Sequence, residues 1–255
     1  MPAGEHGTVP PSLRQRRRAT ATREILDAAE RHITEHGPAA LSLRAVARSL
    51  GMTVQALYHY FPNRDALLTA LIAKTYEDLA DAVRTALDTT ADDTTADDTT
   101  AGDTAADGAP VPRLVVAAEG YRRWAITHPE RFQLIYGAPL RHYAAPAEGP
   151  TTLAVRRMSA IFQRELFDGC TPAQLAAADT PALSSSLQAH LDGLGELPPP
   201  ATALLLSAWG HMHGLVVLEV FGHTSFIGDH QAEIFRLAMR SMLDDIHRRI
   251  PADPP

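Results

Sequence analysis

The sequence predicts an all-α protein, and three observations support this fold class. Apolar residues recur at helical spacing over residues 25–86 and again over residues 113–249. Gly and Pro residues divide these periodic segments into pieces of helix length. The sequence shows no sustained alternation rich in β-branched residues, which is the pattern expected of strands. With 255 residues, 45% apolar and 21% charged, the chain is long enough for one large domain or two small ones.

Four helices are expected in the N-terminal part of the chain. The first stops at Gly37, the second is capped by Ser42, and the short third helix is capped by Thr53. A long fourth helix begins at Arg64, and Asp65 complements its N-terminal dipole. The residues expected to face inward are Ile25, Ala28, Ala29, His32, Ile33, Leu43, Val46, Ala47, Leu50, Leu57, Phe61, Leu68, Ile72, Thr75, Leu79, Val83 and Ala86.

A low-complexity tract over residues 88–110 follows these helices. The unit TTADD recurs in it with a period of five, and it contains no large apolar residue. Such a composition cannot bury enough surface to offset the entropy lost on ordering. Residues 88–110 are therefore expected to be a disordered Asp/Thr/Ala linker.

Further helices are expected after this tract. Their ranges are 113–127, 130–136, 151–167, 171–191 with a break at 179–181, 201–221 and 229–249. The helix over residues 201–221 is the most apolar, but His211, His213 and Glu219 would be costly in lipid. A buried helix of a soluble protein, with no membrane contact, is therefore expected. The first twenty residues hold an arginine run without an apolar core, so no secretory signal is expected.

Charge is distributed unevenly along the chain, whose net charge is −7. Residues 11–64 hold nine arginines and four acidic residues, a balance of +5, which leaves −12 for the remainder. A basic N-terminal segment on an acidic body indicates that one end faces a polyanion. Residues 1–20 are expected to form a disordered basic arm, which either contacts DNA or only aids solubility. Its arginines are Arg14, Arg16, Arg17 and Arg18.

The second and third expected helices form a helix-turn-helix unit. They are joined by the three residues Gly51-Met52-Thr53, a turn that lets two helices cross steeply. The third helix is too short to be stable alone, so it must lie on its neighbours and leave one face outward. Gln55 can read adenine, Val54 can contact a thymine methyl, and His59 can reach guanine or a phosphate. A plain helical corner is the alternative interpretation of this unit.

The run GMTVQALYHYFPNRDALL over residues 51–68, preceded by LSLRAVARSL over residues 41–50, resembles the DNA-binding domain of TetR-family transcriptional regulators. The resemblance covers residues 23–79 without a break, and WGHMHGL over residues 209–215 resembles one branch of the family's C-terminal domains. The resemblance implies that Val54, Gln55 and His59 read bases. It also implies that Tyr58 and Arg64 contact phosphates; the family usually has a lysine at the position of Arg64. Ser42 and Thr53 are implied to contact the DNA backbone, and Arg44 to lie at the groove edge.

Two stripes in the last two helices are expected to form a dimer interface. Small residues at helical spacing allow another helix to approach closely, and two such helix pairs would form a four-helix bundle, as the resemblance also implies. An intrachain pair of core helices is the alternative. The expected interface residues are Ser207, Gly210, Gly214, Leu218, Phe221, Ile234, Leu237 and Ser241.

An effector pocket is expected among the C-terminal helices, with apolar walls and a few polar groups. Either His213 or Arg157 would be its polar anchor, although each wall residue is also a plausible core residue. His211 and His213 are two residues apart and point to different helix faces, so no metal site is expected. The candidate pocket residues are Tyr121, Trp124, Phe132, Tyr136, Met158, Phe162, Trp209 and His213.

These features predict a cytoplasmic, homodimeric transcriptional regulator rather than an enzyme. No phosphate-binding loop, nucleophile elbow or zinc-protease motif is present, and neither a cofactor nor catalysis is expected. The expected activity is repression, with a small-molecule effector releasing the protein from a palindromic double-stranded DNA operator. An activator or an architectural DNA-binding protein without a ligand is the alternative. The expected organisation is a basic arm (1–20), a helix-turn-helix domain (21–66), a connecting helix (67–87), a linker (88–110) and a C-terminal effector-binding and dimerisation domain (111–250).

Overall fold

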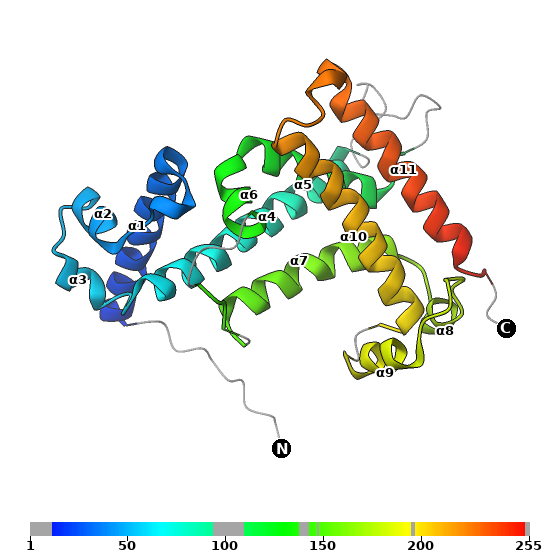
Figure 1. Cartoon of the computed structure of the whole chain (residues 1–255), viewed down its shortest axis with the longest axis horizontal. Helices are drawn as coiled ribbons and strands as arrows, with labels where there is room; N and C mark the ends of the chain where they lie inside the picture. The colour runs from blue at the N-terminus through cyan, green and yellow to red at the C-terminus, as the bar shows by residue number, and fades with distance from the viewer. Residues whose placement is uncertain (1–11, 94–109, 138–142, 147, 195–196, 253–255) are drawn as a thin grey trace. The chain divides into compact units, whose positions relative to one another are not determined.

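The structure is a computed structural model that describes residues 12–93, 110–137, 143–146, 148–194 and 197–252. Within these ranges the chain forms eleven α-helices and two short 3-10 helices, and it contains no strand (Figure 1). The all-α fold class is therefore confirmed. The chain divides into two compact units. One contains the chain up to Thr75 together with Glu130–Thr152, and the other contains Tyr76–Pro129 and the chain from Leu153 onward.

The first unit is built on the N-terminal helices. These are α1 (Leu13–His36), η1 (Pro38–Ala40), α2 (Leu43–Ser49), α3 (Val54–Tyr58) and the beginning of α4 (Arg64–Asp93). Helix α1 packs against α2 and η1, and α2 packs against α3. Four residues predicted to face inward, Ile25, Ile33, Leu57 and Leu68, are fully buried in the core. Leu67 and Leu71, which were not predicted to face inward, are fully buried there as well. His32, expected in the inward stripe, is half-buried, and its Nε2 lies 3.2 Å from the Ala40 carbonyl oxygen.

The basic segment before Glu24 is helical rather than an extended arm. Helix α1 begins at Leu13, so the expectation of a disordered arm is wrong for residues 13–20, while residues 1–11 lie outside the described ranges. The physical reason is a capping box. The Ser12 hydroxyl accepts from the Gln15 amide at 3.3 Å, and the Gln15 side chain accepts from the Ser12 amide at 2.7 Å.

Helix α4 is longer than the connecting helix expected over residues 67–87. It continues to Asp93, so residues 88–93 are helical where a linker was expected, and residues 94–109 lie outside the described ranges. The threonines of the tract support this extension. The hydroxyls of Thr89 and Thr90 donate to the carbonyls of Thr85 and Ala86, at 2.8 and 3.0 Å. Such bonds to the preceding turn let threonine remain in a helix.

Residues 130–152, which were expected in the C-terminal domain, group with the N-terminal helices. They include most of α6 (Pro129–Tyr136). An Arg131 guanidinium nitrogen lies 3.0 Å from the carboxylate of Glu30 on α1, and Lys74 Nζ on α4 donates to both oxygens of that carboxylate at 3.0 Å. The Tyr143 hydroxyl also lies 3.1 Å from the Thr69 hydroxyl. Partly buried ion pairs thus join α1, α4 and α6 in one unit.

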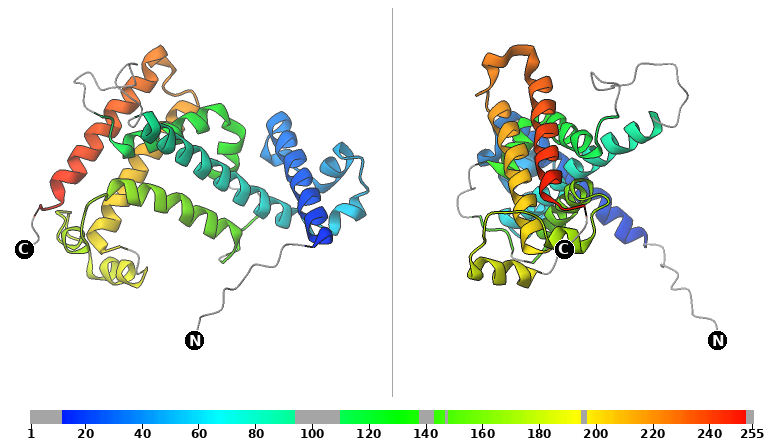
Figure 2. Two further views of the ribbon diagram at one scale, coloured as in Figure 1. Left: turned by 180° about the vertical axis from the view of Figure 1, so that it is seen from behind. Right: turned by 90° about the vertical axis from the view of Figure 1, so that its right-hand side faces the viewer.

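The second unit is helical throughout the residues described. Its helices are the rest of α4, α5 (Arg113–Thr127), most of α7 (Pro150–Leu166), α8 (Pro172–Ala176), α9 (Ser185–Leu194), α10 (Pro199–Val220), η2 (Ser225–His230) and α11 (Gln231–Arg249). Helix α5 packs against α10 and α11, which lie side by side (Figure 2). Gly120 brings α5 close to α4, because a Cβ at this position would lie 2.9 Å from the Ala86 Cβ. The bounds of α5, α7, α10 and α11 lie within two residues of those expected.

Candidate functional site

The helix-turn-helix unit is held by local hydrogen bonds. The Ser42 hydroxyl caps α2 by accepting from the Ala45 amide at 3.2 Å, and the Thr53 hydroxyl caps α3 by accepting from the Ala56 amide at 3.2 Å. The turn between the helices requires Gly51, whose φ of 64° lies in the left-handed region. A capping hydroxyl still has its own hydrogen to donate, so both caps remain able to contact a phosphate.

One face of α3 is buried and the other is exposed. Leu57 has no exposed surface and Phe61 is 6% exposed, whereas Tyr58 is 44% exposed. Gln55 and His59 are exposed beside Tyr58, Val54 is half-buried, and Arg44 on α2 is exposed. The side chains expected to contact DNA are thus accessible, and the two that were expected in the core are buried.

Arg64 has a structural contact that the sequence did not indicate. Its Nε donates to the Leu41 carbonyl at 3.1 Å, and the side chain is partly buried. This bond ties the start of α4 to the segment before α2. Arg64 therefore helps hold the helix-turn-helix unit together, whether or not its guanidinium also contacts a phosphate.

The first unit carries a basic surface at the N-terminal end of α1. All five arginines between Leu13 and Glu24 are exposed, and no acidic residue interrupts them; they are Arg14, Arg16, Arg17, Arg18 and Arg23. Because α1 is a helix over this segment, these charges are held on a rigid element. A rigid, positively charged helix next to the exposed α3 is suited to a polyanion with a regular groove.

Part of the expected effector pocket is an aromatic cluster in the second unit. The ring centroids of Tyr121 and Phe162 are 6.0 Å apart, and those of Trp209 and His213 are stacked at 5.4 Å. The Tyr121 hydroxyl lies 2.8 Å from His213 Nδ1. Met158, one turn before Phe162 on α7, is also buried. The structure therefore brings Tyr121, Phe162, Trp209 and His213 together where α5, α7 and α10 meet.

The other three expected pocket residues are on α5 and α6. Phe132 and Tyr136 form a ring pair on α6, with centroids 5.1 Å apart, and belong to the first unit. Trp124 stacks on His128 at 5.2 Å and lines a separate pocket. Arg157, the alternative anchor, is exposed and lies 3.2 Å from Glu77.

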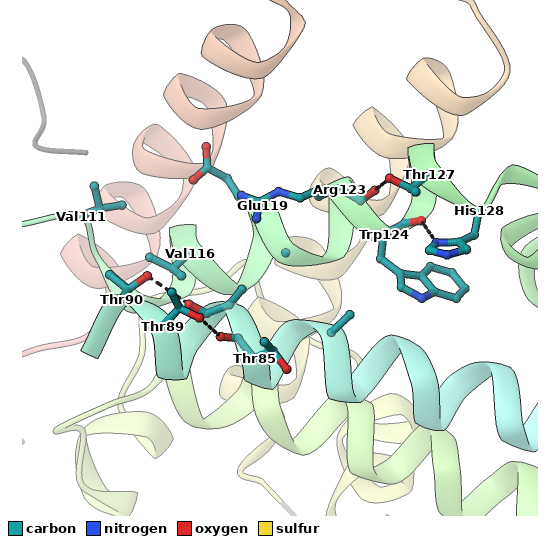
Figure 3. A pocket seen from close by; sticks show the side chains of 13 residues that line it. Thr85, Thr89, Thr90, Val111, Val116, Glu119, Arg123, Trp124, Thr127 and His128 are labelled. Carbon is teal, nitrogen blue, oxygen red and sulfur yellow. Dashed lines mark hydrogen bonds between the residues drawn. The ribbon is translucent and has the colours of Figure 1, made fainter. Parts of the chain in front are cut away.

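The pocket that contains Trp124 has a volume of about 530 Å³ and lies between α5 and the second half of α4 (Figure 3). This volume is within the range of small-molecule sites. Its walls include apolar side chains such as Val116, hydroxyls such as Thr85 and Thr89, and the exposed Arg123. This pocket was not predicted, because residues 88–110, which include Thr89 and Thr90 of its lining, were expected to be a linker. The threonines at helical spacing, Thr85 and Thr89, were the available signal.

The expected dimer residues form an apolar surface on the single chain. Leu218, Phe221, Ile234 and Leu237 are 42%, 45%, 46% and 56% exposed, respectively. Ser207, Gly210 and Ser241 are exposed on the same helices, and Gly214 is half-buried. This surface on α10 and α11, called the α10–α11 face below, is unusual for a surface that remains in water.

Metal sites and membrane-spanning helices are two further features to consider in the described residues. No group of three or more His, Cys, Asp or Glu residues there is placed to hold a metal ion. Helix α10 is long and apolar enough to cross a membrane by length and composition, with a mean hydropathy of 1.4. One such helix is weak evidence, because core helices of soluble proteins have the same composition.

A helix-turn-helix unit with an exposed polar face, a basic α1 and a separate helical body together define a DNA-binding transcriptional regulator. The chain belongs to the TetR family of these regulators. Residues 25–71 match the family model "bacterial regulatory proteins, tetR family", and residues 114–242 match "tetracyclin repressor-like, C-terminal domain".

Similar proteins support this assignment. The HTH-type transcriptional regulator Rv1816 of Mycobacterium tuberculosis is 33% identical over 205 residues, which cover 78% of this chain and 80% of that protein. The HTH-type transcriptional repressor Rv1474c of the same species is 33% identical over 70 residues, 28% of this chain and 37% of that protein. The solved regulatory protein SCO4313 is 29% identical with a TM-score of 0.65, over 91% of this chain and 100% of that one.

Acidification is expected to destabilise the second unit through His213. Burial lowers the pKa of His213 from its ordinary value of 6.5, so the folded state binds a proton less readily than the unfolded chain. The resulting stability is present above about pH 6.5 and is lost as the pH falls through the folded pKa. Denaturant midpoints measured from about pH 7 to about pH 5 should fall less steeply for His213→Gln than for the natural protein. His211→Gln, at an exposed neighbouring position, is the control. If the midpoint of His213→Gln falls as steeply as that of the natural protein, His213 does not cause the loss of stability.

Proposed function

We propose that this TetR-family regulator is a homodimeric repressor, released from a palindromic operator by a small-molecule effector. DNA binding is supported above all by one observation, the exposed face of α3 beside the basic helix α1. Gln55, Tyr58 and His59 are accessible there, while Leu57 anchors the helix in the core. Repression is supported by the likeness over 70 residues to Rv1474c, which is named a repressor.

The α10–α11 face supports the homodimer. A two-fold dimer presents one recognition helix per subunit, and each reads the same half-site. Successive major grooves on one side of the duplex are ~34 Å apart, so the two α3 helices must be separated by about that distance. The operator is therefore proposed to be an inverted repeat.

Effector release requires two dimer geometries with different affinities for DNA. A ligand changes the equilibrium only if it prefers the geometry in which the α3 helices no longer match the groove spacing. Helix α4 contributes residues to both units, and its second half also forms one wall of the pocket near Trp124. We infer that a ligand in this pocket acts on α4. The proposed compartment is the cytoplasm, and the proposed activity involves no catalysis.

The test is selection of bound genomic DNA by the purified full-length protein. The expected result is enrichment of one short inverted repeat, with much weaker binding to an isolated half-site. Equal affinity for the half-site and the repeat would overturn the dimeric reading of the operator. Enrichment without sequence preference would instead support an architectural DNA-binding protein. Reporter expression from the recovered site, in the presence and absence of the protein, separates repression from activation.

Gln55→Ala is expected to relax the preference at one base pair in each half-site. Gln55 is exposed on α3, and a bidentate bond from glutamine to adenine discriminates against the wrong base by roughly 1–3 kcal/mol. The same selection, repeated with the variant, should return a repeat that is degenerate at that position. Arg48→Ala, on the exposed face of α2, is the control. An unchanged preferred repeat for Gln55→Ala would show that Gln55 does not read a base.

A further inference from the structure

The recognition helix α3 is a single turn, and its ends determine whether it keeps its shape. It has five residues, Val54–Tyr58, too few for a helix that is stable alone in water. Its N-terminal end is held by the Thr53 cap. Its C-terminal end is at His59, one of the side chains proposed to contact DNA. Whatever holds His59 therefore also aims the recognition face.

Arg18 on α1 contacts this C-terminal end. Its Nη2 donates to the His59 carbonyl at 3.2 Å, and its guanidinium carbon lies 5.5 Å from the centroid of the Tyr60 ring. Carbonyls at the C-terminal end of a helix lack N–H donors within the helix and carry the negative end of its dipole. A guanidinium can bond such a carbonyl and stack on an aromatic ring at once.

We propose that Arg18 is a positioning residue for the recognition helix. The other arginines of the run attract DNA through their positive charge. This inference rests on the proposed reading of DNA by α3. Arg18 is linked to His59 and Tyr60, which follow α3 in the sequence, and it belongs to a helix that is itself fixed in the core by Ile25 and Ile33. Arg18 therefore contributes to sequence specificity. If α3 is displaced, the protein loses contacts to bases but keeps its electrostatic attraction to phosphates.

Arg17 provides the matched comparison. It is an arginine of the same helix, next to Arg18 and exposed, but one residue further along a helix points about 100° away. Removing Arg17 takes away the same charge from the same turn of α1. Any difference between Arg17 and Arg18 variants therefore reports the contacts to His59 and Tyr60 rather than charge.

The experiment measures the affinity of the full-length dimer for its selected operator and for a scrambled duplex of equal length, over a series of salt concentrations. Arg18→Ala should lower the ratio of operator to scrambled affinity by about tenfold, the loss expected for one hydrogen bond to a charged group. Arg17→Ala should lower both affinities by the same factor and leave the ratio unchanged. Arg18→Lys keeps the charge but loses the planar fork, so it should also lower the ratio, and Tyr60→Leu should lower it in part.

Several outcomes would overturn the inference. If Arg18→Lys behaves like the natural protein while Arg18→Ala reduces the salt slope by about 0.9, Arg18 contacts a phosphate directly. If Arg18→Ala lowers both affinities equally together with the thermal midpoint, its role is only structural. If the natural protein itself shows no sequence preference, the proposed function fails first. If the natural protein is sequence-selective and every Arg18 variant keeps the same ratio of operator to scrambled affinity, only the positioning role of Arg18 is rejected.

Discussion

Leu237→Asp is expected to convert the dimer into a monomer and to lower operator affinity by at least about 100-fold. Leu237 belongs to the α10–α11 face and, at 56%, is its most exposed large apolar residue. In a two-fold dimer the substitution places two carboxylates in one apolar interface, and an unpaired buried charge costs several kcal/mol. A monomer binds one half-site and loses the gain from linking two binding events. Sedimentation and operator titration measure the two effects.

Leu153→Asp is the matched control for this prediction. Leu153 is a leucine of α7 with almost the same exposure, 55%, but it does not belong to the α10–α11 face. This variant should remain dimeric and bind the operator with unchanged affinity. A dimeric Leu237→Asp protein, or a monomer that binds the full repeat as tightly as the natural dimer, would show that the α10–α11 face is not the functional interface.

Helical spacing was sufficient to predict most of the fold. The positions of Ile25, Leu57 and Leu79 at helical intervals predicted their burial, and all three are buried. Local punctuation also predicted the Ser42 and Thr53 caps, which the structure contains. These features depend on residues close in sequence, which is why they can be recognised without the structure.

Two helix boundaries were predicted wrongly, because composition was given more weight than local hydrogen-bonding groups. The arginine run suggested a disordered arm, although Ser12 and Gln15 stand at the spacing of a capping box. The Asp/Thr/Ala tract suggested a linker from residue 88, although threonine hydroxyls bond back to the preceding turn and keep α4 helical to Asp93. In both places the helix extends beyond the limit that composition indicated.

Contacts between residues far apart in the sequence could not be predicted. No periodicity in the sequence connects Glu30 with Arg131, yet this pair helps place residues 130–152 in the first unit. The same is true of Arg18 and His59, and of Tyr121 and His213. The candidate effector residues are mostly large apolar side chains at helical positions, a property that core residues and pocket walls share. Trp124 is the one that lines the pocket in Figure 3.

Glu219→Leu is expected to lower the free energy of unfolding of the second unit by about 3–5 kcal/mol. Two nitrogens of Arg122 on α5 donate to the two carboxylate oxygens of Glu219 on α10, at 2.6 and 2.5 Å. The side chains are only 13% and 10% exposed. Removing the carboxylate leaves a guanidinium in a largely dry site, where it lacks the compensation of its partner. Denaturant unfolding measures the loss, and Glu77→Leu, from an exposed pair with Arg157, should cost less than about 1 kcal/mol.

A double variant distinguishes the net contribution of the Arg122–Glu219 pair to the free energy of unfolding from the cost of removing only one partner. Arg122→Met combined with Glu219→Leu removes both charges, so it should recover most of the stability that Glu219→Leu loses. Arg122 also lies 5.8 Å from the ring of Phe235 on α11, so the pair touches both helices that carry the α10–α11 face. If the pair also fixes the register of these helices, the double variant should be stable yet dimerise more weakly than the natural protein. Full dimerisation of the stable double variant would show that apolar packing alone sets the geometry of the face, and that the ion pair matters only when half of it is removed.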